Sequence, residues 1–144
     1  MTDMVDGAVD ADTVFDRGLR GYVAAAGALL GVGLESCTID AGAPASVYLA
    51  LDGQLSAFPD RDVALLWDER QGWSLAIETY SGEDLIVLTY LGDELLPSPE
   101  QVARFARSVV AGEHILGEPT PPEHAAVART ELASRVAGYL PTRW

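Results

Sequence analysis

The sequence is short of positive charge: it has no lysine, and its nine basic residues are all arginine. Against them stand 22 acidic residues, which gives a formal net charge of −13 at pH 7. Nucleic acids and anionic membranes attract proteins whose lysine and arginine side chains replace the bound counterions. This charge balance therefore disfavours both as direct partners.

Cysteine is almost absent as well. The single cysteine, Cys37, excludes an intramolecular disulfide and any zinc site built from several cysteines, so a reducing cytoplasm fits best. The longest uncharged apolar run, residues 21–34, has 14 residues and four glycines. A helix that crosses a bilayer needs about 20 apolar residues, and the N-terminus is acidic where a signal peptide is basic. We therefore expect a cytoplasmic protein without a membrane span.

What remains is the composition of an ordinary globular protein. Hydrophobic residues make up 49% and charged residues 22% of the 144 residues, a length that suits one domain. Residues 1–12 carry four aspartates and no basic residue, a pattern typical of a disordered acidic arm. We expect a single domain over residues 13–140.

Helical periodicity and start signals predict three helices. The first, about residues 13–31, opens on a capping-box pair, Thr13 and Asp16. Glycines at its end favour a helix cap over a phosphate-binding loop, because such a loop follows a strand and opens a helix. Ser98 and Pro99 begin the second helix, about residues 98–112, and a further proline-containing start signal begins the third, about residues 120–140.

Between residues 36 and 91 the hydrophobic period changes to two, which predicts five β-strands. The short connections after the third and fourth strands leave room for hairpins only, so the sheet is mainly antiparallel. The predicted fold class is α+β, with the element order α-β-β-β-β-β-α-α. The strands span about residues 36–40, 45–51, 62–69, 73–80 and 85–91.

The two faces of this sheet differ in their expected partners. Pairing Trp67 with Trp73 places both tryptophans on a core face. With Tyr80 opposite Leu85, the other face carries an apolar cluster too large to stay wet, and we predict that it binds a partner. The predicted partner-binding residues are Leu66, Tyr80, Leu85, Val87 and Leu91.

Two covers for this second face stay open. A symmetric dimer would bury it against a second copy, and we favour this cover because dimers are the commonest soluble assembly. The third helix, which follows a proline-rich link, would cover it if it crossed the sheet. A one-residue bulge in the last hairpin would also exchange the two sets of side chains of the fifth strand.

No pattern in the sequence establishes catalysis. His114 and His124 lie near acidic residues but are separated by prolines and glycine, so we predict no metal site. We interpret Cys37 as a small buried residue rather than a nucleophile. Carboxylate pairs at strand ends would suit acid–base chemistry, but no nucleophile motif accompanies them, and we predict no catalytic residue and no cofactor. These pairs are Asp60 with Asp62, Asp68 with Glu69, and Glu83 with Asp84.

Two stretches resemble a known family. They are PDRDVALLWDERQGW at residues 59–73 and GEDLIVL at residues 82–88. They are similar to an actinobacterial family of small acidic proteins known only as a domain of unknown function, of the 6292 type. The resemblance covers about residues 17–112, and it implies neither an activity nor a site residue.

Three functions stay open from the sequence. The leading hypothesis is a non-enzymatic interaction module that self-associates or holds a protein partner through its sheet. The alternatives are a domain that encloses a small molecule between the sheet and the first helix, and an enzyme that uses the turn carboxylates. The net charge also permits binding to a basic protein by electrostatic steering.

Overall fold

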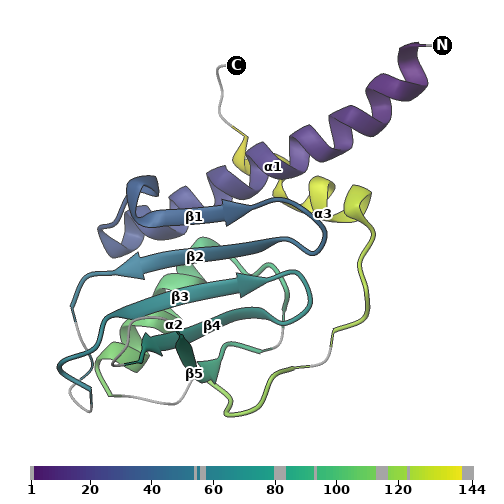
Figure 1. Ribbon diagram of the computed structural model, residues 1–144. Helices are drawn as coiled ribbons and strands as arrows, with labels where there is room; N and C mark the ends of the chain where they lie inside the picture. The colour runs from purple at the N-terminus through teal and green to yellow at the C-terminus, as the bar shows by residue number, and fades with distance from the viewer. Residues whose placement is uncertain are drawn as a thin grey trace.

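The structure, a computed structural model, describes residues 2–53, 55, 58–79, 84–92, 94–112, 117–122 and 124–140, with side chains from residue 11 onward. It confirms the predicted α+β class: one helix, a five-stranded antiparallel sheet, then two helices (Figure 1). The elements are α1 (Thr2–Leu30), β1 (Cys37–Asp40), β2 (Ser46–Leu51), β3 (Val63–Asp68), β4 (Gly72–Glu78), β5 (Leu85–Tyr90), α2 (Pro99–Val110) and α3 (Arg129–Val136), with short 3-10 turns at Leu34–Ser36 and Ala137–Tyr139.

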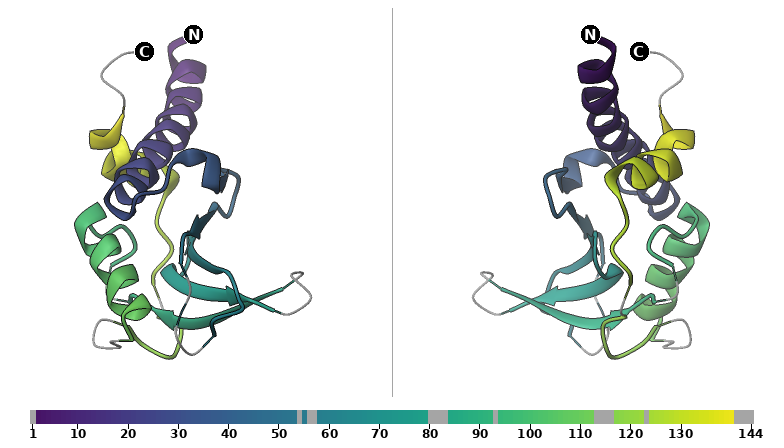
Figure 2. Two further views of the ribbon diagram at one scale, coloured as in Figure 1. Left: turned by 90° about the vertical axis from the view of Figure 1, so that its left-hand side faces the viewer. Right: turned by 90° about the vertical axis from the view of Figure 1, so that its right-hand side faces the viewer.

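The strands follow one another across the sheet in chain order, and each pairs with its neighbour in the antiparallel sense. Trp67 lies opposite Trp73 as predicted. The helices gather on one side of the sheet (Figure 2). Within the described ranges, no helix is both long and apolar enough to cross a membrane.

The core lies between the helices and the sheet. Phe15 and Leu19 of α1 and Phe105 of α2 are fully buried, and they belong to one apolar cluster with Trp67 and Trp73. Both tryptophans are 1% exposed, which confirms the prediction that they face the core. These buried side chains lie between α1 and the sheet.

A chain of buried hydrogen bonds crosses this core. The indole nitrogen Nε1 of Trp73 donates to the Tyr22 hydroxyl at 3.0 Å, and that hydroxyl donates to the carbonyl oxygen of Pro97 at 2.5 Å. Trp67 Nε1 donates in the same way to the carbonyl oxygen of Leu95, at 2.8 Å. Burial raises the pKa of the Tyr22 phenol, so the hydroxyl keeps its proton and remains a donor. The bonds fix α1 and the β5–α2 connection to the sheet.

Two of the predicted helix signals are present where the sequence places them, whereas Thr13 and Asp16 lie inside a helix that starts earlier. Ser98 and Gln101 form a reciprocal capping box at the start of α2, each side chain bonding the other's backbone N–H. At the end of α1, Gly31 has φ +79°, and the Val32 N–H donates to the Gly27 carbonyl at 2.9 Å. This is a glycine helix cap, as predicted, and not a phosphate-binding loop.

The first helix is longer than predicted. It begins at Thr2 instead of Thr13, so the backbone of the segment expected to be a disordered arm continues the helix. Extending an existing helix adds one hydrogen bond for each residue that is fixed, and it needs no second nucleus. Propagation from the packed part of α1 therefore explains the difference.

The last helix is shorter than predicted. It begins at Arg129 and not near residue 120. The residue that precedes a proline is disfavoured in the helical region, and Thr120 and Pro121 both precede one. Two prolines in succession therefore delay the helix instead of starting it.

The last helix also packs on α1 and does not cross to the far face of the sheet (Figure 2). Two glycines of α1 allow the close approach: a Cβ atom at Gly18 would overlap Val136, and one at Gly21 would overlap the carbonyl oxygen of Tyr139. The third helix, the alternative cover that the sequence left open for the second sheet face, therefore lies elsewhere.

Replacing Trp67 with alanine should destabilise the protein by about 3–5 kcal/mol, because the change leaves a cavity in a packed core. The Leu95 carbonyl would also lose its hydrogen-bond donor. Chemical denaturation followed by circular dichroism measures the loss. A loss below about 1 kcal/mol would contradict the burial described here.

Tyr22→Phe isolates the hydrogen-bond chain from the packing. It should cost about 1–3 kcal/mol, because Trp73 Nε1 and the Pro97 carbonyl stay buried without their partner. Tyr139→Phe is the matched control, since the Tyr139 hydroxyl makes no hydrogen bond within the described part of the chain. Equal losses in the two variants would show that the chain of hydrogen bonds adds nothing to stability.

Candidate functional site

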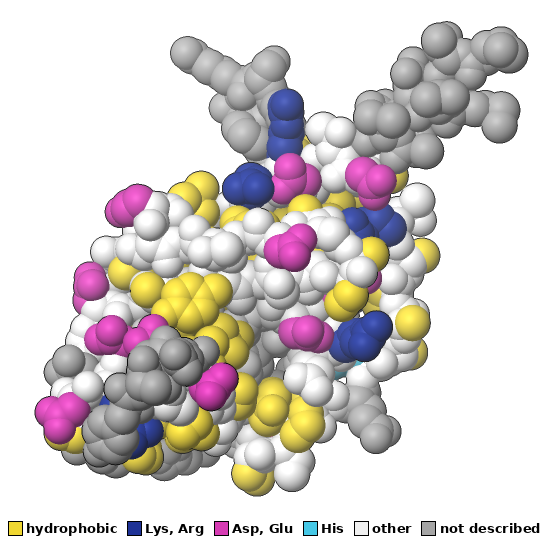
Figure 3. Space-filling model, viewed as in Figure 1, with side chains coloured by type: hydrophobic (Ala, Val, Ile, Leu, Met, Phe, Trp, Pro, Cys, Tyr) yellow, Lys and Arg dark blue, Asp and Glu magenta, His cyan; other side chains and the backbone are white. Residues whose placement is uncertain are grey.

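The sheet face turned away from the helices, here called the outer face, is the candidate site. No helix in the described part of the chain lies on it (Figures 1 and 2). Figure 3 views this face, where hydrophobic side chains lie over the strands with acidic side chains around them. Alternation along the strands places these described side chains on it: Thr38, Asp40, Ser46, Tyr48, Ala50, Ala64, Leu66, Asp68, Ser74, Ala76, Glu78, Leu85, Val87 and Tyr90.

Small residues form the middle of the outer face. Ala64 and Ala76 are fully buried and Ser74 is 5% exposed, although no helix covers them. The larger side chains beside them, such as Tyr48 and Leu66, are half-buried. The accessible apolar surface of the face therefore lies on these larger side chains, beside small residues that their neighbours already bury.

The charges on the outer face all have one sign. Asp40, Asp68 and Glu78 lie on it, and its strand residues include no arginine. The Tyr48 hydroxyl donates to Glu78 Oε1 at 3.1 Å. Burial, and then this bond to the carboxylate, raise the pKa of the Tyr48 phenol. The arrangement suits an apolar partner with positive charges at its edge.

Three of the five predicted partner-binding residues, Leu66, Leu85 and Val87, lie on the outer face. Tyr80 lies outside the described residues. Leu91 was wrongly predicted there: it packs against the core cluster on the helix side.

A β-bulge causes this error. The register of β4 with β5 shifts by one residue between Leu75 and Ala76, so Leu88 is the extra residue on β5. Past the bulge, Thr89 turns to the core face opposite Leu75, and Tyr90 turns to the outer face opposite Ser74. Uninterrupted alternation from Leu85 would instead place Thr89 on the outer face and Tyr90 on the core face. Both alternating sets of β5 are apolar before the bulge, so the pattern carries no signal that locates it.

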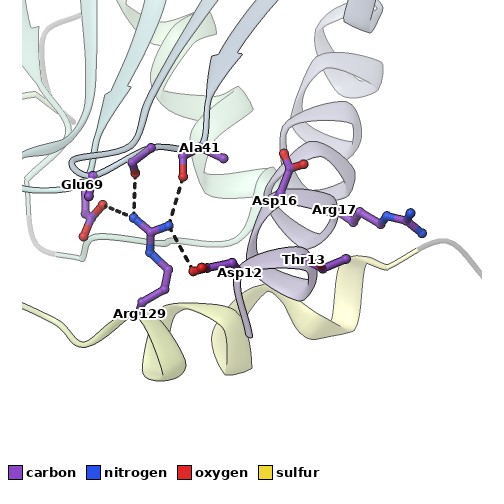
Figure 4. Close-up of a pocket in the computed structure, with 9 residues that line it drawn as sticks. Asp12, Thr13, Asp16, Arg17, Ala41, Glu69 and Arg129 are labelled. Carbon is purple, nitrogen blue, oxygen red and sulfur yellow. Dashed lines mark hydrogen bonds and ion pairs between the residues drawn. The ribbon is translucent and has the colours of Figure 1, made fainter. Parts of the chain in front are cut away.

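A second candidate is the open cavity of about 790 Å³ around Arg129 (Figure 4). The guanidinium donates to the carbonyls of Ala41 and Gly42 at 3.0 and 2.7 Å, donates to Glu69 Oε1 at 3.1 Å, and lies 4.3 Å from the centre of the Phe15 ring. These contacts hold α3 to the β1–β2 and β3–β4 turns. The cavity is thus built around a structural clamp. It is lined by Asp12, Thr13, Asp16, Arg17, Ala41, Gly42, Ala43, Glu69 and Arg129.

Where they are described, the carboxylates proposed for acid–base chemistry either accept backbone N–H groups or lie exposed at strand ends. Asp68 accepts the backbone N–H groups of Arg70 and Gln71, and Glu69 accepts that of Ala45. Asp60, Asp62 and Asp84 are exposed at the ends of strands, and Glu83 lies outside the described residues.

The remaining candidates from the sequence are a thiol and two histidines. Burial raises the pKa of the Cys37 thiol, so the reactive thiolate is disfavoured. His124 is half-buried, and its Nε2 has no hydrogen-bond partner, while His114 lies outside the described residues. Among the described side chains, no three His, Cys, Asp or Glu residues gather as metal ligands would.

The Tyr48–Glu78 pair can be tested by titration. Because the folded pKa of Tyr48 is raised, its protonated form contributes stability that is lost as pH rises above about 10. Glu78→Gln should lower the Tyr48 pKa towards its ordinary value by removing the negative charge. The absorbance titration of each protein, minus that of its Tyr48→Phe counterpart, isolates this phenol. Asp52→Asn, at an exposed site off the outer face, serves as the control and should leave the titration unchanged.

Comparison with known proteins adds one relationship. No curated protein and no solved structure matches the chain. A family model described as a family of unknown function, DUF6292, matches residues 22–108, which is more than half of the chain. The match runs from α1 through the whole sheet to α2, so it includes the outer face and omits α3. The chain therefore belongs to the DUF6292 family of unknown function.

Proposed function

We propose that this protein is a cytoplasmic interaction module, not an enzyme, and that its outer face binds a basic protein. The observation that carries the proposal is an apolar sheet face that no described helix covers and whose charged strand residues are all acidic. Leaving such a surface in water costs about 25 cal/mol per Å² of apolar area. A partner that buries it would recover this free energy.

The aromatic side chains of the outer face support protein binding. Tyr48 and Tyr90 are both half-buried, so each keeps part of its ring available for contact. Tyrosine is enriched among the residues that dominate binding energy, because it combines a large apolar surface with a polar end. The two tyrosines lie on β2 and β5, on opposite sides of the small residues of β3 and β4.

Charge favours a basic partner over a second copy. Each chain carries a formal net charge of −13, and a symmetric dimer through the outer face would bring Asp68 and Glu78 of both copies together. Like charges within the Debye length of about 8 Å repel, whereas a basic partner is attracted and steered to the face. The dimer that the sequence favoured therefore becomes the alternative outcome of the test.

Leu66→Arg tests the outer face at its centre. Affinity capture from the source organism identifies the bound protein, and calorimetry then measures its affinity for each variant. We expect a basic partner, a loss of affinity of about tenfold or more for Leu66→Arg, and weaker binding as salt rises. Leu29→Arg is the matched control, since Leu29 is 40% exposed on α1, away from the outer face.

Three results would overturn this assignment. One is an acidic partner, and another is a partner whose affinity is the same for Leu66→Arg and Leu29→Arg. The third is a parent protein that is dimeric by light scattering while a folded Leu66→Arg variant is monomeric, which would identify a second copy as the occupant of the outer face. Circular dichroism of each variant checks that it is folded.

A further inference from the structure

The strand β5 is an edge of the sheet that is only partly paired. Its inner side pairs with β4, and it lies at the end of the sheet farthest from β1 (Figure 1). On its outer side, Tyr90 exchanges two backbone hydrogen bonds with Glu118. The Tyr90 N–H donates to the Glu118 carbonyl at 2.8 Å, and the Glu118 N–H donates to the Tyr90 carbonyl at 2.7 Å. The chain's own return segment therefore shows that this edge accepts an antiparallel strand.

The return segment cannot continue along β5. In antiparallel register with Glu118 opposite Tyr90, residue 121 would face Val87, the next residue along β5 whose backbone groups point outward. Pro119, Pro121 and Pro122 follow Glu118, and proline has no N–H to donate. Pairing accordingly stops after one bridge, and the edge from Leu85 to Val87 lies beyond it.

Backbone geometry shows which groups point outward on that edge. The Asp84 carbonyl accepts from the Thr79 N–H, and the Leu91 N–H donates to the Trp73 carbonyl, so both residues are bonded inward. Alternation along the ladder, with Leu88 as the bulge, turns the backbone groups of Leu85 and Val87 away from β4. No hydrogen bond between described residues satisfies them on this side.

The side chains of the same stretch are apolar and accessible. Leu85 is 38% exposed and Ile86 is 44% exposed, and they point to opposite faces of the sheet. Natural proteins protect sheet edges with lysine, proline, bulges or a covering segment. The bulge at Leu88 and the Glu118 bridge protect only one end of β5.

The charges around this edge are acidic. Asp84 is exposed at one end of the open stretch and Glu118 at the other, and Glu78 lies opposite Leu85 on β4. The described parts of β4, β5 and residues 117–122 contain no arginine. An added strand would therefore be favoured if it carried apolar residues in the middle and lysine or arginine at its ends.

We propose that the edge of β5 from Leu85 to Val87 binds an extended peptide segment, apolar in the middle and basic at both ends, as an added antiparallel strand. Main-chain bonds to Leu85 and Val87 give affinity, and the acidic ends of the site select the charge. The proposal rests on the proposed function, because the segment belongs to the same basic partner. Its side chains would extend the outer face beyond Leu85 and Val87.

The probe is the blocked peptide acetyl-Arg-Val-Thr-Val-Arg-amide, titrated into the full chain labelled with nitrogen-15. We expect shifts confined to β5 and its neighbours, and about tenfold slower hydrogen exchange at the Leu85 and Val87 amides when the peptide saturates the protein. The same peptide with N-methylated valines should not bind, since it lacks the donors for strand pairing. A peptide with glutamate in place of arginine should also fail to bind.

Two variants separate this proposal from the proposed function. Leu85→Pro removes an outward N–H at the start of an edge strand, a position where proline is tolerated, and should abolish peptide binding. Leu66→Arg should still bind the peptide, because Leu66 lies on β3, away from the edge. If Leu66→Arg no longer binds the natural partner but still binds the peptide, both proposals stand. If Leu85→Pro still binds the peptide, the proposed edge site is wrong, and the proposed function of the outer face is unaffected.

Other outcomes would also overturn the edge site. One is equal binding of the N-methylated peptide, which decides the question even if Leu85→Pro fails to fold. Another is slower exchange centred on Tyr48 and Leu66, which would assign the peptide to the outer face alone. A protein that does not bind the peptide at all would exclude the peptide as occupant of the edge. So would slower hydrogen exchange at the Leu85 amide that depends on protein concentration in the absence of peptide. The last result would indicate pairing between two copies.

Discussion

The buried Tyr22 hydroxyl is the constraint on which the arrangement of this protein depends. It accepts from Trp73 on β4 and donates to the Pro97 carbonyl in the connection that leads to α2. Three segments distant in sequence therefore meet at one oxygen atom, in a core where an unmatched polar group would be costly. Because this oxygen lies on the helix side of the sheet, it also determines which side the helices occupy. The outer face is the side of the sheet that no described helix covers.

This one-sided arrangement gives the two sheet faces different chemistry. The tryptophans, with Leu65 and Leu75, are matched to α1 and α2, while alanine and serine occupy the middle of the opposite face. These small side chains are buried by their neighbours although no described helix lies above them. The larger residues around them then supply the area that a partner would bury. The helices thus pack on one face of the strands, and the proposed partner would bind the opposite face.

Local patterns predicted the fold well because they recur over many residues. The alternation of β2 to β4, the Trp67–Trp73 register and the Ser98 cap each rest on short-range rules, and the structure confirms all three. Two features depend on tertiary context: the sequence left a bulge open without locating it, and it did not indicate the close approach of α3 to α1. The bulge at Leu88 lies in a strand that is apolar on both sides, and the contacts of Gly18 and Gly21 join α1 to a segment more than 100 residues away. The sequence therefore located most of the residues of the outer face, but it misplaced those that follow the bulge in β5.

The packing of α3 against α1 has a consequence for how the chain is made. Phe15 and Leu19 are among the first core residues to be synthesised, and Leu132 and Val136, which belong to the same cluster, are among the last. A ribosome adds about 5–20 residues per second, so the apolar stripe of α1 waits several seconds before its covering helix emerges. During that time it is open to non-native contacts or to a chaperone. Folding of this domain is thus completed only after α3 has left the ribosome, although its sheet forms from strands that are neighbours in sequence.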